Sequence, residues 1–504
     1  MKIDLCQSLG QVPGVITRRR VQKDRQMTLG QNQTEPALYA AHEPVFPRRV
    51  KGNFRNLKWL IMAVTLGIYY IVPWLRWDRG PALPDQAVLV DLANRRFFFF
   101  MVEIWPDEFY FVAGLLIMAG LGLFLFTSAL GRVWCGYACP QTVWTDLFIL
   151  VERWIEGDRN ARVRLWNQKW DLRKLRLRLV KWTVWVLIGL ATGGAWVFYF
   201  TDAPTLLRNL LVGTAHPVAY ITIAVMTLTT VFFGGFAREQ ICIYACPWPR
   251  IQSAMMDEDT LVVAYREWRG EPRGKLKKID DGVAQGDCID CMACVNVCPM
   301  GIDIRNGQQL ECINCALCID ACDEVMDRIG KPRGLIDYMA LKDEAAERAG
   351  DKPKNVWKHI FRPRTILYTS LWSVIGIAMV VALFMRSPFG INITPVRNPL
   401  FVTLSDGTIR NTYELRLHNK HGEDRQFEIS VTADQPLVVT MEGQEGTAVT
   451  VPADATATQR LYVTAPPGSA AANHLRTDMR IWVTDMTQKT ERVKVDTVFN
   501  GKGN

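Results

Sequence analysis

Five long apolar stretches constrain the fold of this 504-residue chain more than any other feature. They cover residues 57–75, 109–130, 182–200, 217–236 and 366–385, and the last four contain no Asp, Glu, Lys or Arg. A helix needs about 20 apolar residues to cross a bilayer, and a helix inside a soluble protein rarely stays uncharged for that length. We therefore predict five transmembrane helices.

The distribution of Lys and Arg predicts the orientation of these helices. Residues 1–56 and 151–181 each carry ten basic and four acidic side chains, whereas residues 76–108 carry four basic and six acidic ones. Because basic segments stay in the cytoplasm, we expect residues 1–56, 151–181 and 237–365 to be cytoplasmic. Residues 386–504 then lie across the membrane, in the periplasm of a Gram-negative bacterium. The net charge of +9 thus reflects orientation in a membrane, and no nucleic-acid-binding motif accompanies it.

Two polar regions need a separate interpretation. The first 50 residues lack the apolar core of a signal peptide, and no apolar run follows Arg18, Arg19 and Arg20. We interpret residues 1–56 as a basic cytoplasmic tail, in which the lone Cys6 belongs to no motif. Residues 87–105 are apolar but charged at intervals, and we expect an interfacial amphipathic segment there.

The four segments within 57–236 form an internal duplication. The second ends in Cys135-Gly-Tyr-Ala-Cys139-Pro, and the fourth ends in Cys242-Ile-Tyr-Ala-Cys246-Pro. The proline after each second cysteine disfavours helical geometry at that cysteine, so each thiol pair is expected where a helix breaks at the membrane surface. The two pairs should face each other across the bundle. Soft thiolates suit Cu(I), zinc or the iron of a shared cluster, and the spacing leaves all three open.

The strongest motif is a doubled cysteine run in residues 288–322. Both runs have the spacing C-x2-C-x2-C-x3-C, which is the pattern of two-cluster bacterial ferredoxins; only the first is followed by proline. In that pattern the fourth cysteine of each run ligates the cluster of the other run. The expected sets are Cys288, Cys291, Cys294 and Cys322 for one [4Fe–4S] cluster, and Cys312, Cys315, Cys318 and Cys298 for the other. Ligation by cysteine alone leaves no open iron site for a substrate, so we expect these two clusters to carry electrons.

The composition changes after the fifth apolar segment. Alternating segments at 412–417, 426–431, 437–441, 448–451, 460–465, 479–483 and 492–499 are separated by turn residues. About seven short strands predict an immunoglobulin-like sandwich. His418 and His421 lie in this region, and we interpret them as part of a solvated turn. We interpret His216 and Tyr220, near the far-side end of the fourth segment, as structural.

The fold class is therefore a multi-domain membrane protein. A bundle of five helices comprises two repeats in 57–236 and a fifth span at 366–385. The cytoplasmic segment 237–365 contains a two-cluster ferredoxin-like α+β insert with its core at 280–330. Residues 386–504 form a C-terminal all-β sandwich.

This combination of features resembles the CcoG family, also called FixG or RdxA, of cytochrome oxidase accessory proteins. The resemblance covers nearly the whole chain from about residue 40. It implies an inner-membrane enzyme that reduces Cu(II) to Cu(I) during assembly of a cbb-type haem–copper oxidase. It also implies copper chaperones and oxidase subunits or assembly factors as partners, together with an unidentified cytoplasmic electron donor. The copper-linked thiols carried over are Cys135, Cys139, Cys242 and Cys246.

Two other functions remain open on the sequence. One is a membrane subunit that passes electrons from quinol to a partner enzyme, although no haem-attachment motif or quinone site is evident. The other is a non-enzymatic scaffold for oxidase assembly, with the sandwich as a docking module. The chain contains no nucleotide-binding glycine motif, which argues against a flavin- or nucleotide-dependent reductase.

Overall fold

The structure is a computed structural model that describes residues 44–80, 83–275, 285–351, 356–386, 389–444, 446–487 and 491–503. Almost all of this lies in one compact unit, Phe46–Asn504. Cys6 and the triplet Arg18, Arg19 and Arg20 lie outside the described residues.

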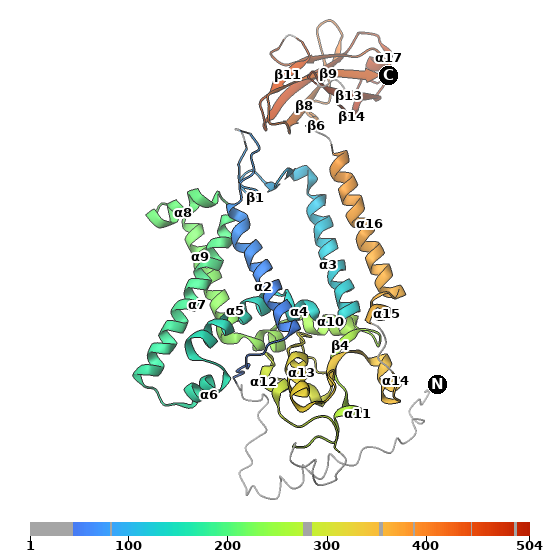
Figure 1. The fold of residues 1–504 in the computed structure, drawn as a ribbon. Coiled ribbons are helices and arrows are strands. Elements are labelled where there is room, and N and C mark those ends of the chain that lie inside the picture. The colour runs from blue at the N-terminus through green and yellow to red at the C-terminus, as the bar shows by residue number, and fades with distance from the viewer. Residues whose placement is uncertain are drawn as a thin grey trace, which may run out of the picture. The chain divides into compact units, whose positions relative to one another are not determined.

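Five helices in the described residues are long and apolar enough to cross a membrane (Figure 1). These candidate spans are Asn53–Trp74 (α2 and η1), Tyr110–Leu130 (α3), Leu172–Phe198 (α7), Pro217–Ala237 (α9 and η3) and Pro363–Met385 (α16). The five expected spans are therefore present as helices. The third begins ten residues before the expected position 182, because Asp171 caps the helix by accepting a hydrogen bond from the Arg173 backbone N–H.

Helices α7 and α9 pack closely because of two glycines four residues apart. A Cβ atom on Gly193 would lie 2.8 Å from the Ile223 carbonyl oxygen, and one on Gly189 would lie 3.0 Å from the Thr227 and Val231 side chains. Small residues at this spacing let apolar helices approach each other where lipid offers no hydrophobic driving force. The two halves of the expected duplication differ here, since α3 packs against α16 instead.

Shorter helices connect the candidate spans. They are α4 (Val133–Tyr137), α5 (Pro140–Glu156), α6 (Arg159–Asn167), α8 (Ala203–Val212), the π-helix η4 (Ile241–Ala245), α10 (Trp248–Met255), α14 (Glu344–Arg348) and α15 (Val356–Ile360).

Residues 87–105 form a small sheet instead of the expected amphipathic segment. Strands β1 (Val88–Asp91), β2 (Arg96–Phe99) and β3 (Val102–Ile104) make an antiparallel meander. Two of the charged side chains in this segment, Arg96 and Glu103, form an ion pair within the sheet. Arg96 lies opposite Asp91, and its Nη1 is 3.4 Å from Glu103 Oε1. The η2 turn (Pro106–Glu108) then leads into α3.

The cysteine-rich insert is built on a two-stranded antiparallel sheet. Strand β4 (Leu261–Tyr265) pairs with β5 (Ile336–Ala340), and the cysteine runs lie between them in sequence, with α12 (Ala293–Val297), η6 (Ile304–Asn306) and α13 (Leu317–Ile329). The short α11 (Glu267–Gly270) and η7 (Leu341–Asp343) flank the strands. The sheet is buried along the whole of β4, and it holds both cysteine runs against one core.

The insert is attached to the first candidate span through Asp320 on α13. The Asp320 carboxylate accepts hydrogen bonds from the backbone N–H groups of Arg55 (2.8 Å) and Phe54 (3.3 Å), in the first turn of α2. Helix α2 has no side-chain cap of its own. A carboxylate at a helix N-terminus satisfies unpaired donors and is favoured by the helix dipole. This contact fixes the insert to the end of α2.

The C-terminal region is a two-sheet sandwich. One sheet has the order β10–β12–β8–β6 with β7 also paired to β8, and the other has the order β11–β9–β13–β14. All seven expected strands are present, as β8 (Ile409–Asn419), β9 (Arg425–Ala433), β10 (Val438–Met441), β11 (Ala448–Val451), β12 (Thr456–Ala465), β13 (Thr477–Asp485) and β14 (Arg492–Phe499). Strands β6 (Phe389–Pro395) and β7 (Val402–Thr403) and the short α17 (Ala470–Asn473) were not predicted. Alternating side chains of both sheets fill one core.

Candidate metal and electron-transfer site

The two Cys-x-Tyr-Ala-Cys-Pro motifs share the same backbone geometry at their second cysteine. The second cysteine of each leaves the helix with ψ near 125°, at Cys139 (φ −59°, ψ 128°) and at Cys246 (φ −78°, ψ 125°). In each motif the N–H of this cysteine donates to the carbonyl five residues earlier, on Trp134 and Ile241. The proline that follows disfavours helical geometry at the cysteine, so the chain turns there as expected.

The structure brings the four thiols of these motifs together. Cys242 lies close enough to Cys139 and Cys135 for a negative charge on either sulfur to raise the pKa of Cys242. Cys135 lies close enough to Cys246 for the same effect on its own pKa. Burial raises the pKa of Cys135 to about 11 and that of Cys242 to about 12. We call Cys135, Cys139, Cys242 and Cys246 the thiol tetrad. The Cys135 and Cys242 thiols therefore stay protonated at neutral pH unless a bound cation favours the thiolate.

The spacing within the tetrad bears on what it can hold. Within the described part of the chain, no three cysteine sulfurs lie within 4.8 Å of one another. Zinc with Zn–S bonds near 2.3 Å needs sulfurs about 3.8 Å apart. The tetrad is therefore too open for a closed tetrahedral zinc site in this conformation.

Gln252 on α10 is a tetrad neighbour that sequence analysis missed. The Cys135 thiol donates to Gln252 Oε1 (3.0 Å), and Gln252 Nε2 donates to Thr127 Oγ1 (3.3 Å) at the end of α3. Gln252 is fully buried. Gln252 thus links the first motif to α10, which is the helix that follows the second motif. Its position six residues after Cys246 carries no recognisable signal in a single sequence.

The first motif contacts the second cysteine run directly. The Tyr137 hydroxyl donates to the Cys315 carbonyl (3.1 Å), and Tyr137 is only 4% exposed. A Cβ atom on Gly136 would lie 2.6 Å from the Ile313 carbonyl oxygen, so only glycine permits this approach. The corresponding Tyr244 of the second motif is 70% exposed. The two motifs therefore share the turn at their second cysteine but differ in their contacts.

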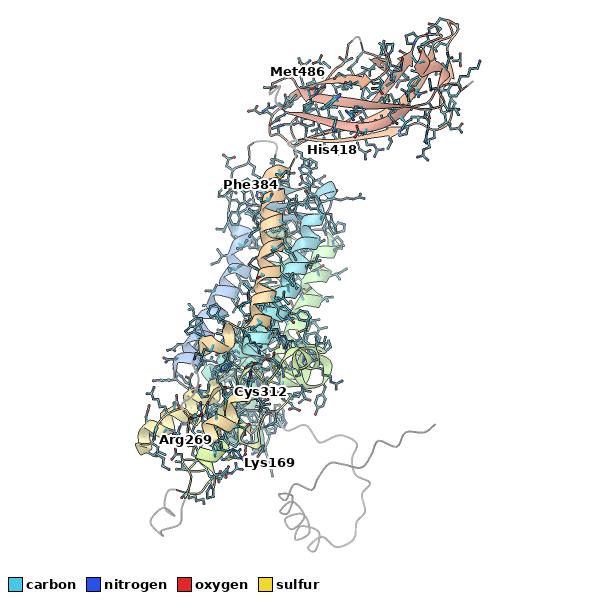
Figure 2. All side chains as sticks on the ribbon, turned by 90° about the vertical axis from the view of Figure 1, so that its right-hand side faces the viewer. Lys169, Arg269, Cys312, Phe384, His418 and Met486 are labelled. Atoms are coloured by element: carbon cyan, nitrogen blue, oxygen red, sulfur yellow. The ribbon has the colours of Figure 1, made fainter. Side chains whose placement is uncertain are left out.

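Each expected cluster set lines a cavity of its own. One cavity is lined by Cys288, Cys291, Cys294 and Cys322, and the other is lined by Cys298, Cys312, Cys315 and Cys318, with Cys294 also at its wall. The fourth cysteine of each run thus faces the cavity of the other run. Figure 2 marks Cys312 within the insert.

The backbone of the two runs repeats the same turns. Asp290 and Met292 have positive φ in the first run, and Asn314 and Ala316 have positive φ at the matching positions of the second. Residues with positive φ at every second position bend the backbone of each run. The cysteines of a run therefore line one side of a cavity. Apolar walls such as Ile304 and Leu335 enclose the cavities. The residues present therefore fit two iron–sulfur clusters in ligand type and in apolar shielding.

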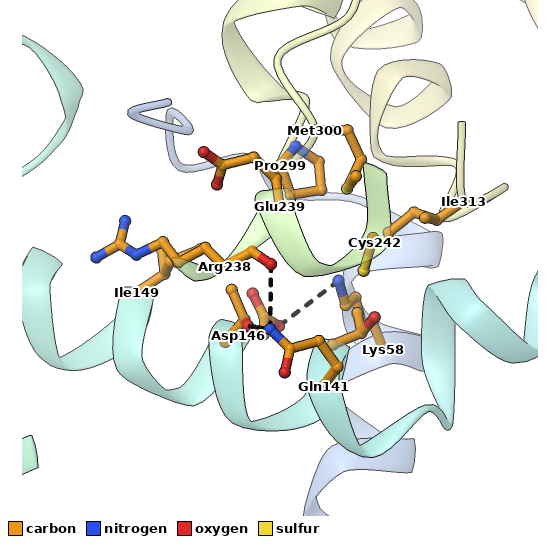
Figure 3. A pocket seen from close by; sticks show the side chains of 12 residues that line it. Lys58, Gln141, Asp146, Ile149, Arg238, Glu239, Cys242, Pro299, Met300 and Ile313 are labelled. Carbon is orange, nitrogen blue, oxygen red and sulfur yellow. Dashed lines mark hydrogen bonds and ion pairs between the residues drawn. The ribbon is translucent and has the colours of Figure 1, made fainter. Parts of the chain in front are cut away.

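A cleft lies between the tetrad region and the end of the first cysteine run, with Ile313 of the second run also in its wall (Figure 3). It is lined by Cys242 on one side and by Pro299 and Met300, which follow Cys298, on another. Lys58 Nζ lies 4.0 Å from Asp146 Oδ2, and Gln141 Nε2 donates to the Arg238 carbonyl (3.1 Å). The cleft thus brings charged and amide side chains close to one thiol of the tetrad.

Family comparisons agree with this arrangement. Residues 237–341 match a family described as a 4Fe-4S dicluster domain, and residues 111–158 match one described as a 4Fe-4S binding domain. Residues 379–502 match the IG-like fold at the C-terminal of FixG. Within 111–158 the cysteines are Cys135 and Cys139 alone.

Three curated relatives cover most of the chain. Protein RdxB of Cereibacter sphaeroides is 72% identical over 95% of this chain and 100% of its own length. Protein RdxA of the same organism is 65% identical over 90% of this chain and 95% of its own length. Nitrogen fixation protein FixG of Rhizobium meliloti is 52% identical over 86% of this chain and 88% of its own length. The chain belongs to the FixG, RdxA and RdxB family of iron–sulfur proteins.

Proposed function

We propose that this protein is a membrane oxidoreductase that reduces Cu(II) to Cu(I) at the thiol tetrad, with electrons passed on through the cysteine-rich insert. The observation that carries the proposal is the contact of Gly136 and Tyr137 with the loop around Cys315. This contact joins the proposed copper thiols to one of the two expected cluster sites within a single packed core, which also contains Cys298 and Cys242.

The proposed chemistry follows from the ligand types. When bound, [4Fe–4S] clusters supply single electrons, which is what the reduction of one Cu(II) requires. Thiolates bind Cu(I) in preference to Cu(II), so the tetrad favours the reduced product. The cleft beside Cys242 would give a copper ion access to one of the four thiols, and Met300 lines the same cleft.

The proposed setting is the inner membrane. The basic segments would face the cytoplasm, together with the insert and an electron donor of unknown identity. The sandwich would lie in the periplasm. The product Cu(I) would pass to copper chaperones for assembly of a cbb-type haem–copper oxidase, whose subunits or assembly factors are the proposed partners.

Serine at all four tetrad positions tests the proposed copper site. We expect the chemically reduced variant to lose Cu(I) formation, measured with a Cu(I)-selective chromophore, because hydroxyls neither hold Cu(I) nor favour it. Iron should remain at about eight atoms per chain, four for each of two clusters. Equal copper reduction by both proteins would contradict the proposal and favour the quinol-linked or scaffold functions.

A second candidate for the tetrad is a third [4Fe–4S] cluster. The match of residues 111–158 to a 4Fe-4S binding domain favours it, since that range contains only the two tetrad cysteines Cys135 and Cys139. The same variant separates the candidates. About twelve iron atoms per chain in the wild type and about eight in the variant would support the cluster, whereas about eight in both would support the copper site.

Substitution of Gly136 by alanine tests the contact between the motif and the insert. The added methyl group would force the Ile313 loop away, and a misplacement of about 1 Å can slow a reaction by up to about 100-fold. We expect Cu(I) formation to slow by about tenfold or more, with iron content unchanged. Gly120→Ala is the control, because no atom lies within 4 Å of its new methyl group. Equal rates in the two variants would show that the contact is not part of the electron route.

A further inference from the structure

A buried arginine without an acidic partner lies between the thiol tetrad and the second cysteine run. Arg132, in the short link from α3 to α4, is 3% exposed. Its Nη1 donates to the Leu310 carbonyl, and its Nε has no hydrogen-bond partner in the described part of the chain. Burying an unpaired charge is costly, so a negative charge is expected close to Arg132.

The other buried arginines show how unusual this position is. Six arginines are buried in the described residues, and all except Arg132 pair with a carboxylate. The five pairs are Arg55–Asp146, Arg162–Glu152, Arg178–Glu156, Arg266–Glu347 and Arg362–Asp257. The negative charge that balances Arg132 therefore comes from groups other than Asp and Glu.

The link that carries Arg132 is fixed against the second cysteine run. The Leu130 carbonyl accepts from Asn314 Nδ2 (3.3 Å), and a Cβ atom on Gly131 would lie 2.6 Å from that same nitrogen. Gly131 ends α3 with a positive φ of 62°, which glycine adopts readily. The Arg132 side chain is therefore held at the start of the second run, where it contacts the backbone.

The groups near Arg132 that can carry negative charge are cysteine sulfurs. Burial raises the pKa of Cys135, Cys242 and Cys312, and the positive charge of Arg132 lowers the pKa of each of them. Arg132 thus lies within electrostatic reach of two tetrad thiols and of one expected cluster ligand. Among the described residues that line the cavity of Cys312, none is charged, so no charge in that cavity wall opposes Arg132.

We propose that Arg132 sets the reduction potential of the cluster expected in the cavity of Cys312. A cluster gains one negative charge when it is reduced, and a positive charge beside it favours the reduced state. Because Arg132 is buried, water screens its charge only weakly. Arg132 thus raises the potential of the cluster site beside the tetrad. The proposal concerns this cluster alone, and it stands whether or not the tetrad binds copper.

The test measures both cluster potentials in the full-length protein in detergent, without copper, by a redox titration followed with electron paramagnetic resonance. Arg132→Gln removes the charge and keeps hydrogen-bonding groups. We expect the reduction equilibrium of one cluster to shift at least about tenfold toward the oxidised state, which for one electron is about 59 mV. The shifted potential should be the one that disappears in Cys318→Ser, and a shift of the other potential instead would overturn the proposal.

The other cluster is the internal reference for this titration. Its cavity has an arginine of its own in the wall, Arg305, which pairs with Asp290 and Asp303. Its potential should therefore stay unchanged when Arg132 is replaced.

Two further variants separate the charge of Arg132 from its shape. Arg132→Lys keeps the positive charge and should restore most of the lost potential. Arg328→Gln is the control, because Arg328 on α13 is 66% exposed and its charge is screened by water and salt. It should shift neither potential.

The outcomes that decide the proposal follow from these variants. Wild-type potentials in Arg132→Gln would overturn it, as would equal shifts in Arg132→Gln and Arg132→Lys. If Arg132→Gln lost iron, the lysine variant would decide. About eight iron atoms per chain and a potential near that of the wild type in Arg132→Lys would support the role of the charge, and loss of iron from both variants would overturn it.

Discussion

A Cys318→Ser variant is expected to lose one iron–sulfur cluster and nearly all copper reduction while keeping the other cluster. Cys318 lines the cavity that also contains Cys298, Cys312 and Cys315, and this is the cavity beside the thiol tetrad. A serine hydroxyl is a poor ligand for cluster iron. Iron content should fall from about eight to about four atoms per chain, and the rate of Cu(I) formation should fall to the background of the tetrad variant.

The matched control is Cys291→Ser, in the other expected cluster set. Cys291 lines the cavity farther along the insert, and it is exposed. This variant should also retain about four iron atoms per chain, but it should still form about one Cu(I) per chain after chemical reduction, because the cluster site beside the tetrad is intact. The opposite pattern, with Cys291→Ser inactive and Cys318→Ser active, would reverse the proposed electron route.

A Glu152→Ala variant is expected to be strongly destabilised. Glu152 on α5 is 2% exposed and pairs with Arg162 and Arg238, and its Oε1 lies 3.3 Å from Lys181 Nζ. Burial alone would raise the pKa of Glu152, but these three cations together lower it to about 2. Removing the carboxylate leaves buried cations without a partner, which typically costs about 3–5 kcal/mol.

The measurement is the melting temperature in detergent as a function of pH. At neutral pH we expect Glu152→Ala to melt about 3–5 °C below the wild type. A carboxylate with a lowered pKa stabilises the fold above its unfolded-state pKa of about 4.5. The two melting curves should therefore converge as pH falls from about 4.5 toward about 2.

The control for this prediction is an exposed ion pair. Glu324 and Arg328 pair on the surface of α13 with side chains 48% and 66% exposed. Exposed pairs contribute no more than about 1 kcal/mol, so Glu324→Gln should leave the melting temperature nearly unchanged. If both variants melted at the wild-type temperature, the buried cluster around Glu152 would not stabilise the fold.

The sequence predicted those parts of the fold that depend on local pattern. Uncharged apolar length predicted the five candidate spans, and alternation predicted the seven strands from β8 to β14. Strand β6 was missed because its buried and exposed residues do not alternate regularly, and β7 because it has only two residues. For residues 87–105 the sequence predicted only an amphipathic segment, because the pairing of Arg96 across the three-stranded sheet could not be seen from spacing.

The candidate site was predictable in its ligand types but not in its contacts. Motif spacing predicted which cysteines the structure gathers around two cavities and one tetrad. The difference between Gly136 and Ile243 is visible in the sequence, yet its meaning depends on the Ile313 loop, which is distant in sequence. His421 was interpreted as part of a solvated turn. Its proximity to Asp485 and Glu491 arises from strand pairing that a single sequence does not reveal.

One measurement tests the central claim most directly. The protein is reduced chemically, freed of reductant and mixed with excess Cu(II) without oxygen, while the signal of reduced clusters and the formation of Cu(I) are followed together. The account predicts about two Cu(I) per chain, one electron for each of two clusters, formed at the rate at which the cluster signal disappears. Formation of Cu(I) while the clusters stay reduced would contradict it, because the thiols alone would then be the reductant.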